Sequence, residues 1–289
     1  MSNKVKLNVY AFITVFLWAA AFPFTKAISG EFSPYSLGLI RCMVASAVLL
    51  IIGKALHIRK PFCRRDLLFL CAAGIAGFAL YLIFFNTGLI TITSATSSVI
   101  VASTPIMTAV VCSCLYNEKI SPPGWVAIFF AFVGVVILMF RKGSLSIDVG
   151  VIWTLAAAVV FCIYNVLNRK LGSAGYSSME IVTYGMVSAT VALLVFLPQS
   201  AADICNAEPA SALIAVGLGL FPSATSYILR AKAMELAEKT NEVTNYMFIT
   251  PLLSTAMGFL ILGEVPDTGT VIGGAVIVAG VVLFGLKGK

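Results

Sequence analysis

The stretch TPIMTAVVCSCLYNE, residues 104–118, decides the fold because it occurs a second time as TPLLSTAMGFLILGE, residues 250–264. Both copies begin with Thr-Pro, continue with mostly apolar residues and end with glutamate, and they lie 146 residues apart (251 minus 105). The same offset relates Gly134-Val135-Val136 to Gly280-Val281-Val282, and Tyr81 to Tyr227. Recurrence at a fixed offset is the signature of an internal repeat. We therefore expect two copies of one unit, over residues 1–142 and 143–289.

The composition is that of a membrane protein. Of the 289 residues, 60% are hydrophobic and 11% are charged, and the mean hydropathy is +1.02, whereas a soluble domain carries roughly 25% charged residues. Apolar stretches near the roughly 20 residues that cross a bilayer as a helix occur ten times, five in each copy. They cover residues 7–28, 35–52, 67–89, 96–116, 125–140, 149–167, 181–197, 212–229, 243–262 and 270–286.

The first stretch also has features of a cleaved signal peptide, with Lys4 and Lys6 before it and Ala19-Ala20-Ala21 near its end. Its removal would leave nine spans and destroy the match between the copies, so we expect it to be retained. Five spans per copy is an odd number, so the second copy must cross the membrane in the opposite sense. Inverted repeats of this kind are a recurring plan of secondary transporters, which bind substrate between the two halves. The fold class expected is an all-α polytopic membrane protein with ten helices in two inverted five-helix repeats.

Basic residues predict the orientation. With the N-terminus on the cytoplasmic side, 15 of the 19 lysines and arginines fall in cytoplasmic segments, and Lys26, Arg141 and Lys142 fall outside. Positively charged loops mark the cytoplasmic face, so both termini are expected in the cytoplasm and the protein in the cytoplasmic membrane. Anionic lipid headgroups attract such loops, and the net charge of +7 needs no nucleic acid to explain it.

Prolines and glutamates recur at equivalent places in the two copies. Pro105 and Pro251 fall near the middle of their spans, where a proline frees a backbone carbonyl and kinks the helix. Each is a candidate hinge, with a static kink as the alternative. Glu118 and Glu264 follow these spans and are interpreted as carboxylates that close a turn, with proton coupling as the alternative. The next helices should be capped by Ser121 and Asp267.

The chain resembles the drug/metabolite transporter superfamily, in particular its ten-helix EamA-type members. The residues that carry the resemblance are Phe16-Leu17-Trp18-Ala19 with Phe22 and Lys26, Arg41, Tyr81 through Gly88-Leu89, Thr104-Pro105 to Asn117-Glu118, Gly134 to Leu138, Leu262-Gly263-Glu264, and Gly273 to Val282. The pattern departs from the family at Ala19-Ala20, where Gly-Ser or Gly-Thr is usual. The resemblance implies a central cavity lined mainly by spans one, three, four, six, eight and nine, with span two away from its centre. It also implies movement of small metabolites, often as export.

Aromatic and polar side chains at helical spacing mark the expected cavity faces. Asparagines at membrane depth should face the bundle interior or water because they are costly in lipid. The candidate substrate-binding residues are Trp18, Phe22, Tyr81, Phe85, Thr104, Tyr164, Asn165, Asn168, Tyr227 and Asn245. Lys26 is expected to reach the headgroups, and Arg41 to be structural, with anion gating as the alternative.

An aromatic, amide-rich cavity without a central carboxylate predicts a neutral or zwitterionic organic substrate. The expected function is export of a small metabolite, an amino acid or related zwitterion, by alternating access. Uptake of a quaternary amine or a nucleotide-sugar-like solute is the alternative, because several aromatics could cage a cation. An intramembrane enzyme is disfavoured because His57, the sole histidine, lies in a loop and no paired carboxylates occur in a span. No metal or cofactor is expected, and the protein is expected to be a monomer in the bilayer.

Overall fold

The computed structural model describes residues 2–55, 64–117, 119–139, 148–238 and 241–287. Within these residues, ten helical segments are long and apolar enough to cross a membrane. The expected all-helical polytopic fold is confirmed.

The first half contains five spans, of which the third and fourth are each built from more than one element. Their elements are α1 (Asn3–Ala27), α2 (Pro34–Ala55), α3 (Leu67–Gly74) with the π-helical segment η1 (Ile75–Leu80) and α4 (Tyr81–Thr91), α5 (Ser94–Ala102) with α6 (Thr104–Tyr116), and α7 (Pro122–Met139).

The second half also contains five spans, three of them interrupted. Its elements are α8 (Val149–Ser173), α9 (Ser178–Leu193) with η2 (Leu194–Phe196) and α10 (Leu197–Asn206), α11 (Pro209–Leu220) with the π-helical η3 (Phe221–Thr225) and α12 (Ser226–Leu236), α13 (Asn241–Thr244) with η4 (Asn245–Ile249) and α14 (Thr250–Leu262), and α15 (Thr268–Lys287).

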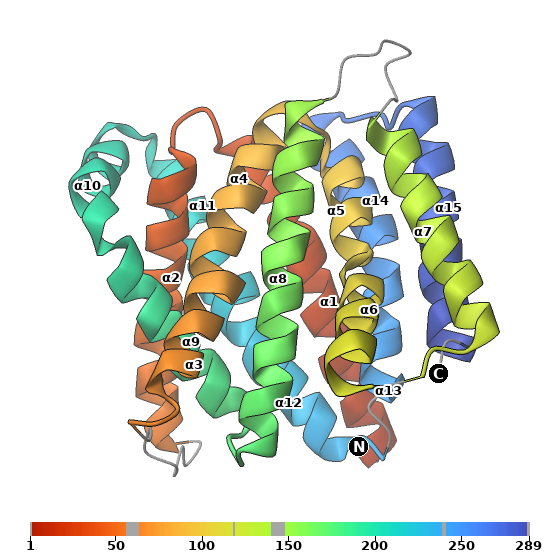
Figure 1. Cartoon of the computed structure of the whole chain (residues 1–289). Helices are drawn as coiled ribbons and strands as arrows, with labels where there is room; N and C mark the ends of the chain where they lie inside the picture. Colours follow the sequence, from red (N-terminus) through yellow and green to blue (C-terminus); the bar gives the residue numbers. More distant parts are fainter. Residues whose placement is uncertain (1, 56–63, 118, 140–147, 239–240, 288–289) are drawn as a thin grey trace.

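The two halves run in opposite directions through the bundle. Figure 1 shows α1 leaving the edge at which both chain ends lie, whereas its counterpart α8 begins at the opposite edge and runs back. An odd number of spans per half requires this inversion.

The backbone repeats the 146-residue offset that the sequence contains. The π-helical segments begin at Ile75 and Phe221 (221 minus 75), and α6 and α14 begin at Thr104 and Thr250. Each of these two 13-residue helices is followed by a left-handed residue, Asn117 with φ 53° and Gly263 with φ 66°. Duplication therefore preserved the interruptions of the helices as well as the helices themselves.

The halves interleave. α1 packs against α12 and α14, α4 against α8, α2 and α3 against α9, and α7 against α15. Small residues let these helices approach closely, as is usual between membrane helices. A Cβ on Gly74 would lie 2.3 Å from the Gly185 carbonyl oxygen, and one on Gly134 would lie 2.7 Å from that of Gly273. The repeat boundary at residues 142 and 143 falls outside the described residues and remains a prediction.

Helix breaks precede both prolines. α5 ends at Ala102 and α6 begins two residues later, so that Pro105 occupies its first turn, where the missing N–H is not needed. The Ser103 and Thr104 hydroxyls donate to the carbonyls of Ile100 and Val101, each at 2.6 Å. In the second half the 3₁₀ segment η4 leads into α14, with Pro251 in its first turn. The helix is therefore interrupted next to the proline at which a kink was expected, in both copies, and a role as a hinge remains a prediction.

The expected helix caps are confirmed. Ser121 Oγ accepts from the Gly124 N–H at 3.2 Å before α7, and Asp267 Oδ1 accepts from the Thr270 N–H at 2.7 Å before α15. The seventh span differs from expectation, because the chain stays helical from Ser178 to Asn206, beyond the expected end at residue 197. Pro198 in the first turn of α10 ends α9 without ending the helical run, and α10 leans away from it in Figure 1.

Candidate functional site

A cavity of about 460 Å³ lies between the two halves. Its lining comes from α1, η1, α4, α5, α6, α8, η3, α12, η4 and α14, which belong to the six spans expected, and also from α2, α9 and α15. On α15 the lining residues are Val281, Phe284 and Gly285, near the helix end that lies beside the chain termini. The cavity therefore extends from the middle of the bundle toward the edge that carries the termini.

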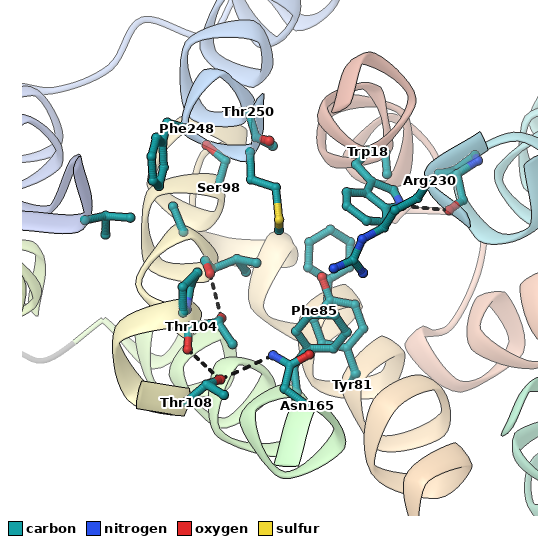
Figure 2. Close-up of a pocket in the computed structure, with 18 of the residues that line it drawn as sticks. Trp18, Tyr81, Phe85, Ser98, Thr104, Thr108, Asn165, Arg230, Phe248 and Thr250 are labelled. Carbon is teal, nitrogen blue, oxygen red and sulfur yellow. Dashed lines mark hydrogen bonds between the residues drawn. The ribbon is translucent and has the colours of Figure 1, made fainter. Parts of the chain in front are cut away.

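One wall of the cavity is aromatic. Trp18 and Tyr227 meet edge to face with ring centroids 5.4 Å apart, Phe22 and Phe85 at 5.0 Å, and Tyr81 stacks on Phe85 at 5.6 Å. The Trp18 indole N–H donates to the Pro222 carbonyl at 3.2 Å, which fixes the ring against η3. Figure 2 shows this wall facing a second one across the cavity.

The second wall carries small polar groups from the broken fourth span. Thr104 and Thr108 lie on α6, and the Thr108 hydroxyl donates to the Thr104 carbonyl at 2.9 Å. Asn165 of α8 donates to Thr108 Oγ1 at 3.3 Å, so the amide reaches between the two helices (Figure 2). These groups can bind the polar part of a ligand whose apolar part lies against the aromatic wall.

Eight of the ten candidate residues line the cavity. They are Trp18, Phe22, Tyr81, Phe85, Thr104, Asn165, Tyr227 and Asn245. Their role in substrate binding remains a prediction.

Tyr164 and Asn168 do not line the cavity, and their expected placement there is corrected. Tyr164 is 1% exposed and packs against Phe78 with ring centroids 5.2 Å apart. Its ring lies where a side chain on Gly77 would be, since a Cβ there would fall 2.4 Å from Tyr164 Cδ2. Asn168 donates to the Tyr164 hydroxyl at 3.2 Å. The face that α8 presents to the cavity is instead Phe161, Asn165 and Arg169, spaced four residues apart.

Arg41 lines the cavity as well, although its span was expected to lie away from the centre. Its side chain is 4% exposed, and Nε donates to Ser223 Oγ at 3.2 Å. An ionisable residue inside a membrane span is a functional candidate by default, and this signal was available in the sequence.

Among the described residues that line the cavity, the charged side chains are all arginines. Arg230 lies with Cζ 5.6 Å from the centre of the Trp18 ring, and Arg169 lies with Cζ 4.4 Å from the Tyr116 ring. Together with Arg41 they place three positive charges on the lining, and no aspartate or glutamate is among the described residues that form it. Arg41 and Arg230 therefore give the part of the lining next to Trp18 a positive charge.

An ion pair lies on the side of the cavity away from the termini. Lys26 Nζ lies 2.9 Å from Glu264 Oε1 and donates to the Ile92 carbonyl at 2.6 Å. Glu264 Oε2 accepts from the Ser94 N–H at 2.8 Å. Lys26 therefore binds within the protein instead of extending to the headgroups, and Glu264 joins α1, α5 and the turn before α15. Glu118, its counterpart, lies outside the described residues.

The sequence interpretation missed the contributions of Phe161, Phe248 and the end of α15. Apolar residues such as Phe161 and Phe248 resemble ordinary packing residues, so no signal distinguished them. Of the two candidate hinges, Pro105 lines the cavity and Pro251 is buried beside it in α14.

Comparison with known proteins decides the family. The model of the EamA-like transporter family matches residues 6–140 and again residues 148–286. The chain belongs to this family. The two matched segments cover nearly the whole chain, and the protein is accordingly a multi-pass membrane transporter.

Two relatives are similar to this chain over nearly the full length of both proteins. The uncharacterized transporter YdfC of Bacillus subtilis is 29% identical over 286 residues, which cover 99% of this chain and 92% of the relative. A protein of Streptantibioticus cattleyicolor named as a probable terminal-alkyne amino-acid exporter is 28% identical, over 97% of this chain and 94% of its own. A solved crystal structure aligns over 97% of both chains with a TM-score of 0.65 and 18% identity, which shows the shared fold.

Proposed function

We propose that this EamA-family transporter exports a small amino acid or related zwitterion across the cytoplasmic membrane by alternating access. The observation that carries the proposal is the composition of the cavity, in which an aromatic wall adjoins Arg41 and Arg230 and no described carboxylate. Such a site attracts a carboxylate and accommodates an apolar side chain. The relative named as a probable amino-acid exporter supports the same substrate class.

The charge of the cavity argues against the quaternary-amine alternative. A cation bound between Trp18 and Tyr227 would lie beside Arg230, whose guanidinium already lies over the Trp18 ring. Like charges at this distance repel inside a low-dielectric site. A nucleotide-sugar-like anion is compatible with the arginines and is an outcome of the test below.

The two ends of the cavity support alternating access with export. The lining extends toward the edge that carries both termini, whereas the Lys26–Glu264 pair ties α1 to α5 and α14 on the other side. With cytoplasmic termini, this conformation would load substrate from the cytoplasm. Release would then require the ion pair to part, which is the motion expected of one half rocking against the other.

Substrate and direction are tested in two steps. Thermal unfolding of the purified full chain is measured with a panel of aromatic and aliphatic amino acids, quaternary amines and nucleotide sugars, because a ligand of the folded state raises its apparent stability. Ligands that stabilise are then supplied to inside-out membrane vesicles, which accumulate the substrate of an exporter. Stabilisation by amino acids with accumulation in these vesicles supports the proposal. Stabilisation by quaternary amines alone, or uptake only by right-side-out vesicles, overturns it.

Alternating access is tested at the ion pair. Glu264→Gln removes the charge and keeps the shape of the side chain, so the far side should open more often. A cysteine at Ser98 in the cavity, in a background in which the native cysteines are replaced, should then react faster with a membrane-impermeant thiol reagent added from that side. Asp267→Asn, which changes a carboxylate of the same turn that caps α15, is the control. An unchanged rate in Glu264→Gln would refute the role of the pair as a gate.

Topology has its own test. A fluorescent protein fused after residue 289 should fluoresce, and alkaline phosphatase fused there should be inactive, because each reporter works on one side of the membrane only. The reverse pattern would place the termini outside the cell, and substrate would then enter this conformation from the outside.

A further inference from the structure

Arg41 is a buried cation for which the described part of the chain holds no counter-ion. It lies in α2, is 4% exposed, and makes two hydrogen bonds, from Nε to Ser223 Oγ at 3.2 Å and from Nη1 to Thr25 Oγ1 at 3.4 Å. A guanidinium has five N–H donors, so three have no partner among the described residues. No aspartate or glutamate oxygen of the described residues lies within 4 Å of the Arg41 guanidinium, because the ion pair found among these residues joins Lys26 to Glu264.

The two hydroxyls compensate the charge poorly. Both are neutral, and the bond to Thr25 is longer than the 2.7–3.2 Å typical of N–H···O bonds. A charge held inside a membrane protein is costly unless it is paired or reaches water. An anion that enters from the cavity would supply the missing partner.

The surroundings of Arg41 leave room for such an anion on the cavity side. Ser223 and Pro222, both of η3, line the cavity beside Arg41, and the Trp18 indole is fixed to the Pro222 carbonyl. η3 therefore holds the cation and the aromatic wall in one place. An organic acid could place its carboxylate on Arg41 while its apolar part lies against Trp18 and Tyr227.

We propose that Arg41 binds the carboxylate of the transported solute. The planar guanidinium matches a carboxylate through two parallel hydrogen bonds, which a lysine cannot form. Arg41 is the most buried arginine of the cavity lining, since Arg230 is half-buried and Arg169 is exposed. This inference rests on the proposed function and narrows it to solutes in which the carboxylate is obligatory.

The test compares an acid with its amide, which has nearly the same shape and lacks the negative charge of the carboxylate. Thermal unfolding of the full chain is titrated with phenylalanine and phenylalaninamide, and separately with phenylacetate and phenylacetamide. Charge-assisted hydrogen bonds are worth enough that each amide should bind about 10- to 100-fold more weakly than its acid. This comparison on the unaltered protein depends on no variant.

Variants then locate the effect. Arg41→Gln should bind acid and amide alike, and Arg41→Lys should keep the charge but bind the acid about tenfold more weakly than the unaltered protein. Arg64→Gln, at an exposed arginine outside the cavity, should behave like the unaltered protein. Size-exclusion chromatography and the unfolding midpoint without ligand show whether each variant is folded.

The outcomes separate this inference from the proposed function. If amino acids bind but Arg41→Gln still distinguishes acid from amide, the inference is wrong and the amino-acid proposal stands. If phenylacetate binds through Arg41 and no amino acid does, the inference stands and the substrate class is wrong. If neither acid binds more tightly than its amide, the inference is wrong.

Discussion

Trp18 and Tyr164 occupy equivalent positions in the two copies of the repeat, 146 residues apart (164 minus 18), yet only Trp18 lines the cavity. Phe22 and Asn168 form a second such pair, again with only the first-half member in the lining. The difference arises at the π-helical segment that faces each residue. Gly77 of η1 admits the Tyr164 ring, whereas its counterpart in η3 is Ser223 (223 minus 77 is 146), whose side chain bonds to Arg41. Two copies of one backbone therefore form a cavity wall in one half and a packed core in the other.

The two ends of the cavity also differ because equivalent positions in the two copies carry different residues. Lys26 of the first half pairs with Glu264 of the second. The position equivalent to Lys26 in the second half is Gly172 (172 minus 26 is 146), which has no side chain to form the corresponding pair. A single lysine thus makes one end of an internally symmetric transporter different from the other.

The largest effect is expected at Tyr164. Tyr164→Ala should lower the free energy of unfolding by about 3–5 kcal/mol, because it removes a fully buried ring and leaves a cavity among Gly77, Phe78 and Phe161. Denaturation in detergent measures the loss. A loss below about 1 kcal/mol, well under that range, would mean that Tyr164 is not a core residue and that the two copies are more alike than the structure indicates.

Exchanging the residues that make the copies different should give the next largest effect. Gly77→Ser adds a Cβ 2.4 Å from Tyr164 Cδ2, and rigid neighbours make such overpacking cost about 1–3 kcal/mol. The matched exchange, Ser223→Gly, adds no atoms and should destabilise less. Equal losses for the two variants would show that Gly77 is not what places Tyr164 in the core.

Trp18 should show the opposite pattern to Tyr164, a loss of transport with little loss of stability. Trp18→Ala, and likewise Tyr227→Ala, should lower the initial rate of transport in vesicles about tenfold, which corresponds to about 1.4 kcal/mol, since each removes half of an aromatic pair that lines the cavity. The unfolding midpoint checks that the variants remain folded. Normal transport by both would place the binding wall elsewhere.

The smallest effect is expected at the left-handed residues that end α6 and α14. Gly263→Ala meets no atom within 4 Å, so its cost is conformational alone, about 1 kcal/mol. Asn117→Gly should be neutral or slightly stabilising, because glycine adopts a φ of 53° at lower cost than asparagine does. The unfolding midpoints of the two variants should shift in different directions or by clearly different amounts, and equal shifts would contradict this reasoning.

The sequence by itself determined the repeat, the ten spans, their inversion and the family, because hydrophobic length and the 146-residue offset act over whole segments and survive small errors in boundaries. It also indicated distortion of the helices at Pro105 and Pro251 and the caps at Ser121 and Asp267, which depend on local backbone chemistry. The tertiary structure decided which face of each helix meets the cavity. A helical pattern places Tyr164 and Asn168 on one face but does not say that Gly77 lies opposite it, and it does not say that Lys26 reaches Glu264 or that Arg41 reaches η3. Those contacts join residues far apart in the chain, so the rotation and packing of the helices alone bring them together.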